Sequence, residues 1–196
     1  MTSVAVAQRP PTVRPLTLDA FLALPEEGPP WQEYLRGVVT EKSMPSELHG
    51  RSVAVLIGEF QDHLKRSHDG FVVTEVRHAA RALDWVYLPD INVRLYGAGP
   101  RAPQARGAVE RAPEFAIEVL SPDDREDRWL PRVDRYFAAG TKLVWTVDPE
   151  ARTIQVHRPD LPASTFGPGD VIDAEPVLHG FSLDITALFA AVYGEA

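Results

Sequence analysis

Hydrophobic and polar positions follow helical spacing in four parts of the chain. Residues 46–66 carry apolar side chains three and four positions apart, which predicts a long helix that begins at Ser46. A short helix is predicted after Thr17, whose side chain can cap it. Further helices are predicted at 121–139, where a glycine follows, and at 182–193. These segments provide the helical part of the expected fold.

The remaining apolar segments have the short or alternating pattern that is typical of β-strands. They are a tight hairpin at 33–39 and runs at 71–76, 85–95, 114–120, 142–147 and 152–157. Pro89 interrupts one of these runs. A crossover helix between two apolar strands indicates an α/β fold. We expect helices that pack on a mixed, curved β-sheet, preceded by an N-terminal helix and hairpin.

Length and composition are those of one globular domain. The chain has 196 residues, of which 44% are hydrophobic and 24% are charged. Residues 1–15 contain three prolines and little periodicity, so we expect a flexible N-terminal tail followed by a single domain at 16–196. No apolar run approaches the about 20 residues that span a bilayer. Cysteine is absent, and we expect a cytoplasmic protein with no membrane-spanning segment.

The net charge of −8, from 28 acidic and 20 basic residues, opposes general attraction to phosphates. Any contact with DNA would therefore need a local basic patch. The loop at 97–113 offers one, because Arg101, Arg106 and Arg111 outnumber Glu110 there. These arginines could contact DNA phosphates. Alternatively, the segment is a solvated surface loop.

Two carboxylates interrupt strands that are otherwise apolar. Asp90 follows Pro89 in the run at 85–95, and Glu118 lies within the run at 114–120. Burying a carboxylate costs free energy unless a cation, backbone donors or a metal ion compensates it. On neighbouring strands, the two side chains could converge on one divalent cation. The alternative is that Asp90 caps a turn and Glu118 pairs with an arginine.

Several short motifs are more specific in their order and spacing than any one of them is alone. They are Leu88-Pro89-Asp90-Ile91, Glu118-Val119-Leu120-Ser121-Pro122, Tyr136 with Ala139-Gly140, and Val144-Trp145-Thr146-Val147-Asp148-Pro149. Over residues 16–189 the chain resembles a bacterial family of restriction endonucleases in the PD-(D/E)XK nuclease superfamily. The resemblance implies mixed β-strands flanked by helices. It also implies Asp90, Glu118 and the carbonyl of Val119 as ligands of Mg²⁺ or Mn²⁺.

The chain departs from the resembling proteins at the lysine that they place near the attacking water. Leu120 stands two residues after Glu118, and Arg132 stands four residues before Tyr136, where the family often has its lysine. Arginine cannot serve as a general base, but it stabilises anionic charge and binds phosphate. We therefore expect Arg132 to contribute charge rather than to accept a proton. Lys142, the other nearby lysine, is expected to cap the following strand.

Two further residues have an ambiguous role. Glu33, in the predicted hairpin, is either an additional acid of the site or a solvated charge. His49, near the start of the long helix, is more typical of a surface or capping histidine than of a catalyst.

Three functions are compatible with these residues. The first is a Mg²⁺-dependent DNA endonuclease, which we expect to be a homodimer because closed two-fold dimers are common and a duplex has two strands to cut. The second is a catalytically impaired relative that binds nucleic acid or mediates oligomerisation. The third is a hydrolase that uses the carboxylate pair on another substrate. The retained carboxylates favour the first, whereas Arg132 and the acidic charge favour the second.

Overall fold

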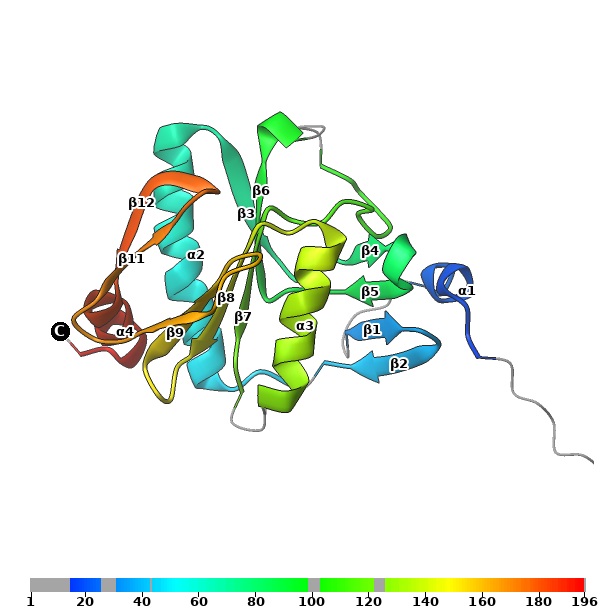
Figure 1. Cartoon of the computed structure of the whole chain (residues 1–196), viewed down its shortest axis with the longest axis horizontal. Coiled ribbons are helices and arrows are strands. Elements are labelled where there is room, and N and C mark those ends of the chain that lie inside the picture. Colours follow the sequence, from blue (N-terminus) through cyan, green and yellow to red (C-terminus); the bar gives the residue numbers. More distant parts are fainter. Residues whose placement is uncertain (1–14, 26–30, 43, 99–102, 122–125, 196) are drawn as a thin grey trace, which may run out of the picture.

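The computed structural model describes residues 15–25, 31–42, 44–98, 103–121 and 126–195. The predicted tail therefore lies, except for Pro15, outside the described residues, and so does Arg101. The described part combines mixed β-sheets with four α-helices, and the predicted α/β class is confirmed (Figure 1).

A six-stranded sheet forms the centre of the described fold, in the order β10-β9-β8-β7-β6-β3. Its strands are β3 (Gly70–Thr74), β6 (Ile91–Leu95), β7 (Phe115–Val119), β8 (Leu143–Asp148), β9 (Thr153–His157) and β10 (Ser164–Phe166). β7 and β8 are parallel, whereas the other neighbours are antiparallel. The sheet is therefore mixed, as predicted, and the parallel pair is joined by the crossover helix α3 (Glu126–Ala139).

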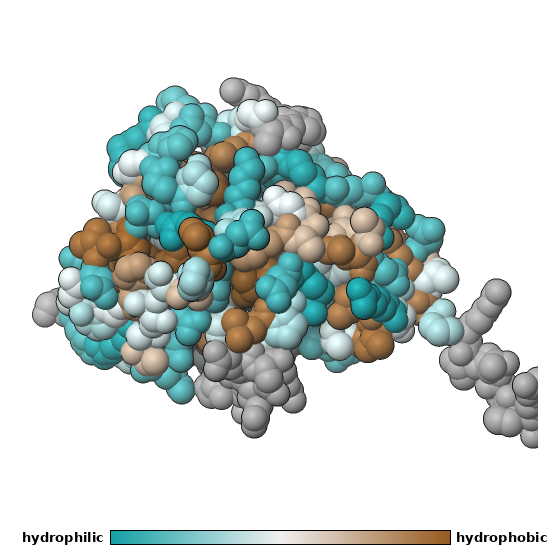
Figure 2. Space-filling model, viewed as in Figure 1, coloured by the Kyte–Doolittle hydropathy of each residue, from teal (hydrophilic) through white to brown (hydrophobic). Residues whose placement is uncertain are grey.

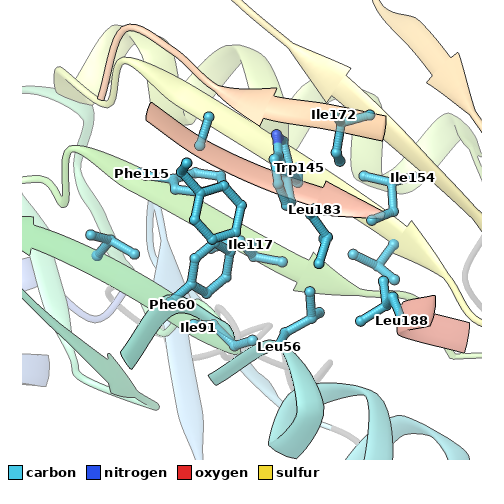
Figure 3. Packing of buried hydrophobic residues seen from close by; sticks show 14 of the residues in the cluster. Leu56, Phe60, Ile91, Phe115, Ile117, Trp145, Ile154, Ile172, Leu183 and Leu188 are labelled. Atoms are coloured by element: carbon cyan, nitrogen blue, oxygen red, sulfur yellow. The ribbon is translucent and has the colours of Figure 1, made fainter. Parts of the chain in front are cut away.

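Helix α2 (Glu47–Ser67) covers one face of this sheet and α3 covers the other (Figure 1). Phe60 of α2 is fully buried and packs with Phe115 and Trp145 of the sheet, and Figure 3 shows the three side chains next to one another. Burial of one such side chain contributes about 1.5–3 kcal/mol to stability. The α2 side of the sheet is thus the main hydrophobic core.

Alternation along β7 decides which face each side chain occupies. Phe115, Ile117 and Val119 belong to the core beneath α2, whereas Ala116 packs with residues of α3. Glu118 therefore points to the α3 side of the sheet.

A smaller sheet, in the order β2-β1-β5-β4, lies beside the crossover helix (Figure 1). It consists of β1 (Gln32–Leu35), β2 (Val38–Glu41), β4 (His78–Ala80) and β5 (Trp85–Tyr87). The predicted hairpin is present, and its turn places Arg36 at φ 48° and Gly37 at φ 87°. Glycine accepts this left-handed conformation without steric cost, so the hairpin can close on two residues.

The single strand predicted at 85–95 is wrong. Its first part is β5 of the small sheet, and its second part is β6 of the large sheet. The break falls at Leu88, Pro89 and Asp90, where proline cannot donate a ladder hydrogen bond. Asp90 therefore lies at the junction of the two sheets.

The predicted cap at Thr17 and the predicted helix start at Ser46 are both present. Thr17 caps α1 (Leu18–Leu22) and Ser46 caps α2, each through a side-chain oxygen that accepts a backbone N–H. The helix predicted at 182–193 was placed three residues too early, because β12 (Leu178–Asp184) continues to Asp184 and pairs with β11 (Val171–Ala174). Asp184 then caps α4 (Ile185–Tyr193).

The surface in the view of Figure 1 mixes hydrophilic and hydrophobic residues rather than separating them into two faces (Figure 2). Within the described residues, no helix is both long enough and apolar enough to cross a membrane.

Candidate functional site

The register of β6 and β7 brings the two predicted carboxylates together. Ile91 pairs with Ile117 at the end of this antiparallel ladder, and Asp90 directly precedes Ile91 while Glu118 directly follows Ile117. The negative charge of Asp90 acts on Glu118, and both side chains line the same cavity. Asp90 Oδ2 also accepts a hydrogen bond from the backbone N–H of Val119 at 2.8 Å. The pair is thus held at the end of β7.

A cavity of about 290 Å³ opens over this carboxylate pair. Its walls come from the β1–β2 hairpin, the start of α2, the end of β7 and α3. Its charged lining residues include Glu33, Glu41, Lys42, Glu75, Asp90, Glu118 and Arg132. Five carboxylates therefore face two permanent cations, which leaves three negative charges in excess when all five are ionised.

Glu33 is buried and belongs to this site rather than to a solvated hairpin. Its Oε1 accepts a hydrogen bond from the backbone N–H of Leu88 at 2.9 Å. Arg132 Nη1 and Nη2 donate to its two oxygens at 2.6 and 2.7 Å. Although burial opposes ionisation, Arg132 lowers the pKa of Glu33. Glu33 is therefore an ionised carboxylate that forms a bidentate ion pair with Arg132.

Arg132 points toward the carboxylates. Its Nε donates to Glu118 Oε1 at 2.6 Å, and its Nη2 lies 3.3 Å from the hydroxyl of Tyr136. Tyr136 in turn donates a hydrogen bond to Glu118 Oε1. Every nitrogen of the guanidinium thus has a partner, so Arg132 fixes two acids in place and adds positive charge to the site.

Glu118 is more easily protonated than an exposed glutamate. Burial raises the pKa of Glu118 to about 6, against the attraction of Arg132, and the negative charge of Asp90 acts in the same direction as burial. A divalent cation beside the pair would favour its ionised form.

Lys42 is a site residue that sequence reasoning missed. It follows β2 directly and its Nζ donates to Asp90 Oδ1 at 2.7 Å. The same Nζ reaches Glu75 Oε2 at 3.0 Å and the carbonyl of Leu88 at 3.0 Å. Burial opposes its charge, but the attraction of Asp90, Glu118 and Glu75 raises the pKa of Lys42. Lys42 therefore stays an ammonium cation and cannot accept a proton.

His49 also lines the cavity, contrary to the surface or capping role expected for it. Its Nε2 lies 3.7 Å from Asp90 Oδ1, although its own backbone N–H meets the Ser46 cap. His49 lies in the first turn of α2, from which its ring reaches Asp90. Neither Lys42 nor Glu75 carried a local sequence signal, because each is an ordinary charged residue at the end of a strand.

Arg111 lies in another part of the molecule. Arg111 Nη2 donates to Glu114 at 3.2 Å and approaches the carbonyl of Leu95 at 3.5 Å. Leu95 ends β6, whereas Asp90 precedes its first residue. Arg111 thus lies at the opposite end of β6 from the carboxylates. Arg106 is exposed.

The residues of the cavity fit a hard divalent cation in charge and in donor type. Carboxylate oxygens are the ligands that Mg²⁺ and Mn²⁺ prefer, and Asp90 and Glu118 could supply them from adjacent strands. In the part of the chain that the structure describes, no group of three or more histidine, aspartate or glutamate side chains is arranged as a metal cluster. The side-chain ligands would therefore be the two carboxylates.

This fold and cavity define a class of protein: a mixed α/β protein with paired acids at the edge between two sheets, opposite a crossover helix. The chain belongs to the Uma2 family, described as "Putative restriction endonuclease", which matches residues 18–186. The predicted resemblance to this family is thereby confirmed.

A solved structure supports the same assignment. The chain is similar to the crystal structure of "a putative nuclease belonging to DUF820" from Anabaena variabilis ATCC 29413. The two share 28% sequence identity at a TM-score of 0.79, over 91% of this chain and 99% of the other. No curated protein matches the chain.

Proposed function

We propose that the chain is a metal-dependent DNA endonuclease of the PD-(D/E)XK superfamily, with residues 16–196 as its single domain. The observation that carries this proposal is the placement of Asp90 beside Glu118 in a cavity with excess negative charge. Family membership supports nuclease chemistry, and the paired acids supply ligands that this chemistry uses.

In the proposed reaction, water attacks a backbone phosphorus atom, the phosphorus–oxygen bond to the leaving nucleotide breaks, and the leaving oxygen takes up a proton. Mg²⁺ or Mn²⁺ bound to Asp90, Glu118 and the carbonyl of Val119 would activate the water and neutralise phosphate charge. Arg132 holds Glu118 in position through its Nε. The positive charges of Arg132 and Lys42 stabilise the negative charge that develops on the phosphate oxygens.

DNA must approach an acidic protein, so local basic groups matter. Arg101, Arg106 and Arg111 remain candidates for contacts with DNA phosphates. Because Arg111 already pairs with Glu114, exposed Arg106 is the better candidate of the two that the structure describes.

The proposal is tested with supercoiled and linear DNA in the presence of Mg²⁺, Mn²⁺ or EDTA. We expect nicked and linear products with either metal and none with EDTA. Asp90→Asn and Glu118→Gln should each lower the cleavage rate by about 10²-fold or more. Glu59→Gln, on the exposed side of α2, is the matched control and should cleave normally. Metal-independent cleavage, or equal cleavage by Asp90→Asn, would contradict the proposal.

One observation favours a second function, a nucleic-acid-binding protein without catalysis. Asp90 is already paired with Lys42, and Glu118 with Arg132. If these ion pairs exclude the metal, fluorescence anisotropy should detect DNA binding that is the same with Mg²⁺ and with EDTA, and no metal should support cleavage.

A further inference from the structure

Lys42 lines the cavity because it directly follows β2, at the end of the β1–β2 hairpin. Its backbone N–H donates to the carbonyl of Trp31 at 2.8 Å, which anchors the end of the hairpin beside the cavity. Its side chain is only 19% exposed. The ammonium group is therefore a fixed part of the site and not a surface charge.

The contacts of Lys42 fall into two groups. One is Asp90 Oδ1 at 2.7 Å, which belongs to the carboxylate pair. The others are both oxygens of Glu75, at 3.0 and 3.2 Å, and the carbonyl of Leu88 at 3.0 Å. An ammonium group has three hydrogens, and these acceptors engage all of them. If the contact with Asp90 were broken, Lys42 would still be held by Glu75 and by the carbonyl of Leu88.

Lys42 binds Asp90 through Oδ1, which is the oxygen that a metal ion would also need. Its Oδ2 accepts the backbone N–H of Val119 at 2.8 Å. Lys42 occupies Oδ1, and His49 Nε2 lies 3.7 Å from that atom. A divalent ion that binds Asp90 therefore meets a positive charge within hydrogen-bonding distance of its ligand, and the two cations repel.

We infer that Lys42 is an internal cation that competes with divalent metal for Asp90 and is retained by Glu75 when the metal binds. This inference rests on the proposed metal site at Asp90 and Glu118. The ammonium group of Lys42 places a lysine charge at the carboxylate pair, although positions 120 and 132 hold no lysine. It also means that metal affinity is limited by the protein's own ammonium group.

The first test is Mn²⁺ binding by isothermal titration calorimetry, without DNA. Lys42→Met should lower the dissociation constant about tenfold or more, because it removes the competing charge. Lys42→Arg keeps the charge and should show no such gain. Lys65→Met, which changes an exposed lysine of α2, is the matched control and should bind as the parent protein does. Equal affinity in Lys42→Met and Lys42→Arg would overturn the inference.

The second test does not depend on the folding of Lys42→Met. Glu75→Gln removes the acceptor that retains Lys42, so the ammonium depends more on Asp90 and Mn²⁺ should bind more weakly. Glu41→Gln makes the same change of charge at another residue of the cavity that does not contact Lys42 in the described hydrogen bonds. The loss of affinity should be about tenfold larger for Glu75→Gln than for Glu41→Gln. Equal losses of Mn²⁺ affinity in the two variants would contradict the inference that Glu75 retains Lys42.

The same titrations separate this inference from the proposed function. If Mn²⁺ binds the parent protein but binds Lys42→Met no more tightly, only the competition is wrong. If Mn²⁺ binds neither protein, the proposed metal site is wrong, and the inferred competition by Lys42 is wrong as well.

Discussion

Arg132 and Glu33 form a bidentate ion pair that joins α3 to β1, with Nη1–Oε2 and Nη2–Oε1 distances of 2.6 and 2.7 Å. The two residues are 99 positions apart in the sequence. The same guanidinium reaches Glu118 through Nε. One arginine therefore connects the hairpin, the crossover helix and the central strand β7.

This arrangement makes Arg132 important for stability. Arg132→Ala leaves two buried carboxylates without their cation, and we expect a loss of about 3–5 kcal/mol in the free energy of unfolding. Urea denaturation measures it. Arg152 makes a similar bidentate pair with Glu195 at the surface, where solvent screens the charges, so Arg152→Ala should cost much less. Equal losses of unfolding free energy in Arg132→Ala and Arg152→Ala would show that burial of the Arg132 ion pair adds nothing to its effect on stability.

The two substitutions at Arg132 should differ in cleavage. Arg132→Ala removes positive charge from the site, and we expect the rate to fall by about 10²-fold or more. Arg132→Lys keeps a charge beside Glu118 and restores the residue type of the resembling family, so it should preserve or raise the rate. Rates are measured at a temperature at which both variants remain folded. Equal rates for both would remove the charge at position 132 from the mechanism.

Divalent metal should stabilise the folded protein. At millimolar Mn²⁺ and a dissociation constant near a tenth of that concentration, the gain is about 1–2 kcal/mol. Thermal melts of the parent protein should shift upward on addition of Mn²⁺, whereas those of Asp90→Ala should not. A shift of the same size in Asp90→Ala would place the metal elsewhere.

Two buried histidines should make the protein sensitive to acid. Burial lowers the pKa of His78 and of His157 to about 4. The unfolded chain binds protons at these positions from about pH 6.5 downward, so the free energy of unfolding falls between pH 6.5 and pH 4. At pH 5 each histidine should account for a loss of about 2 kcal/mol.

Urea denaturation at pH 7 and pH 5 checks this pH dependence. His157→Gln should lose less stability between the two pH values than the parent protein does. The comparison with the parent is needed because the raised pKa of Glu118 acts in the opposite direction. An unchanged pH dependence would mean that His157 does not titrate with folding.

The prediction of a homodimer also awaits measurement. Cutting both strands of a duplex calls for two sites, and two-fold dimers are the commonest closed assemblies. Light scattering at micromolar concentration should give twice the monomer mass of 21.7 kDa. A mass near 21.7 kDa would show that the protein acts as a monomer.

The sequence by itself determined the elements whose signals are local. The Thr17 and Ser46 caps, the apolar spacing of α2 and the buried runs that became β7 and β8 each depend on neighbours within a few positions. Asp90 and Glu118 could be singled out for the same reason, since each interrupts an apolar run.

Only the tertiary structure decided which charged residues meet. Lys42 contacts Asp90 across 48 positions, and Arg132 contacts Glu33 across 99. No periodicity records such contacts, because they depend on how the hairpin and α3 pack against the ends of β6 and β7. The division of 85–95 between two sheets has the same origin, because the pairing of each half is chosen by its spatial neighbours and not by its own pattern.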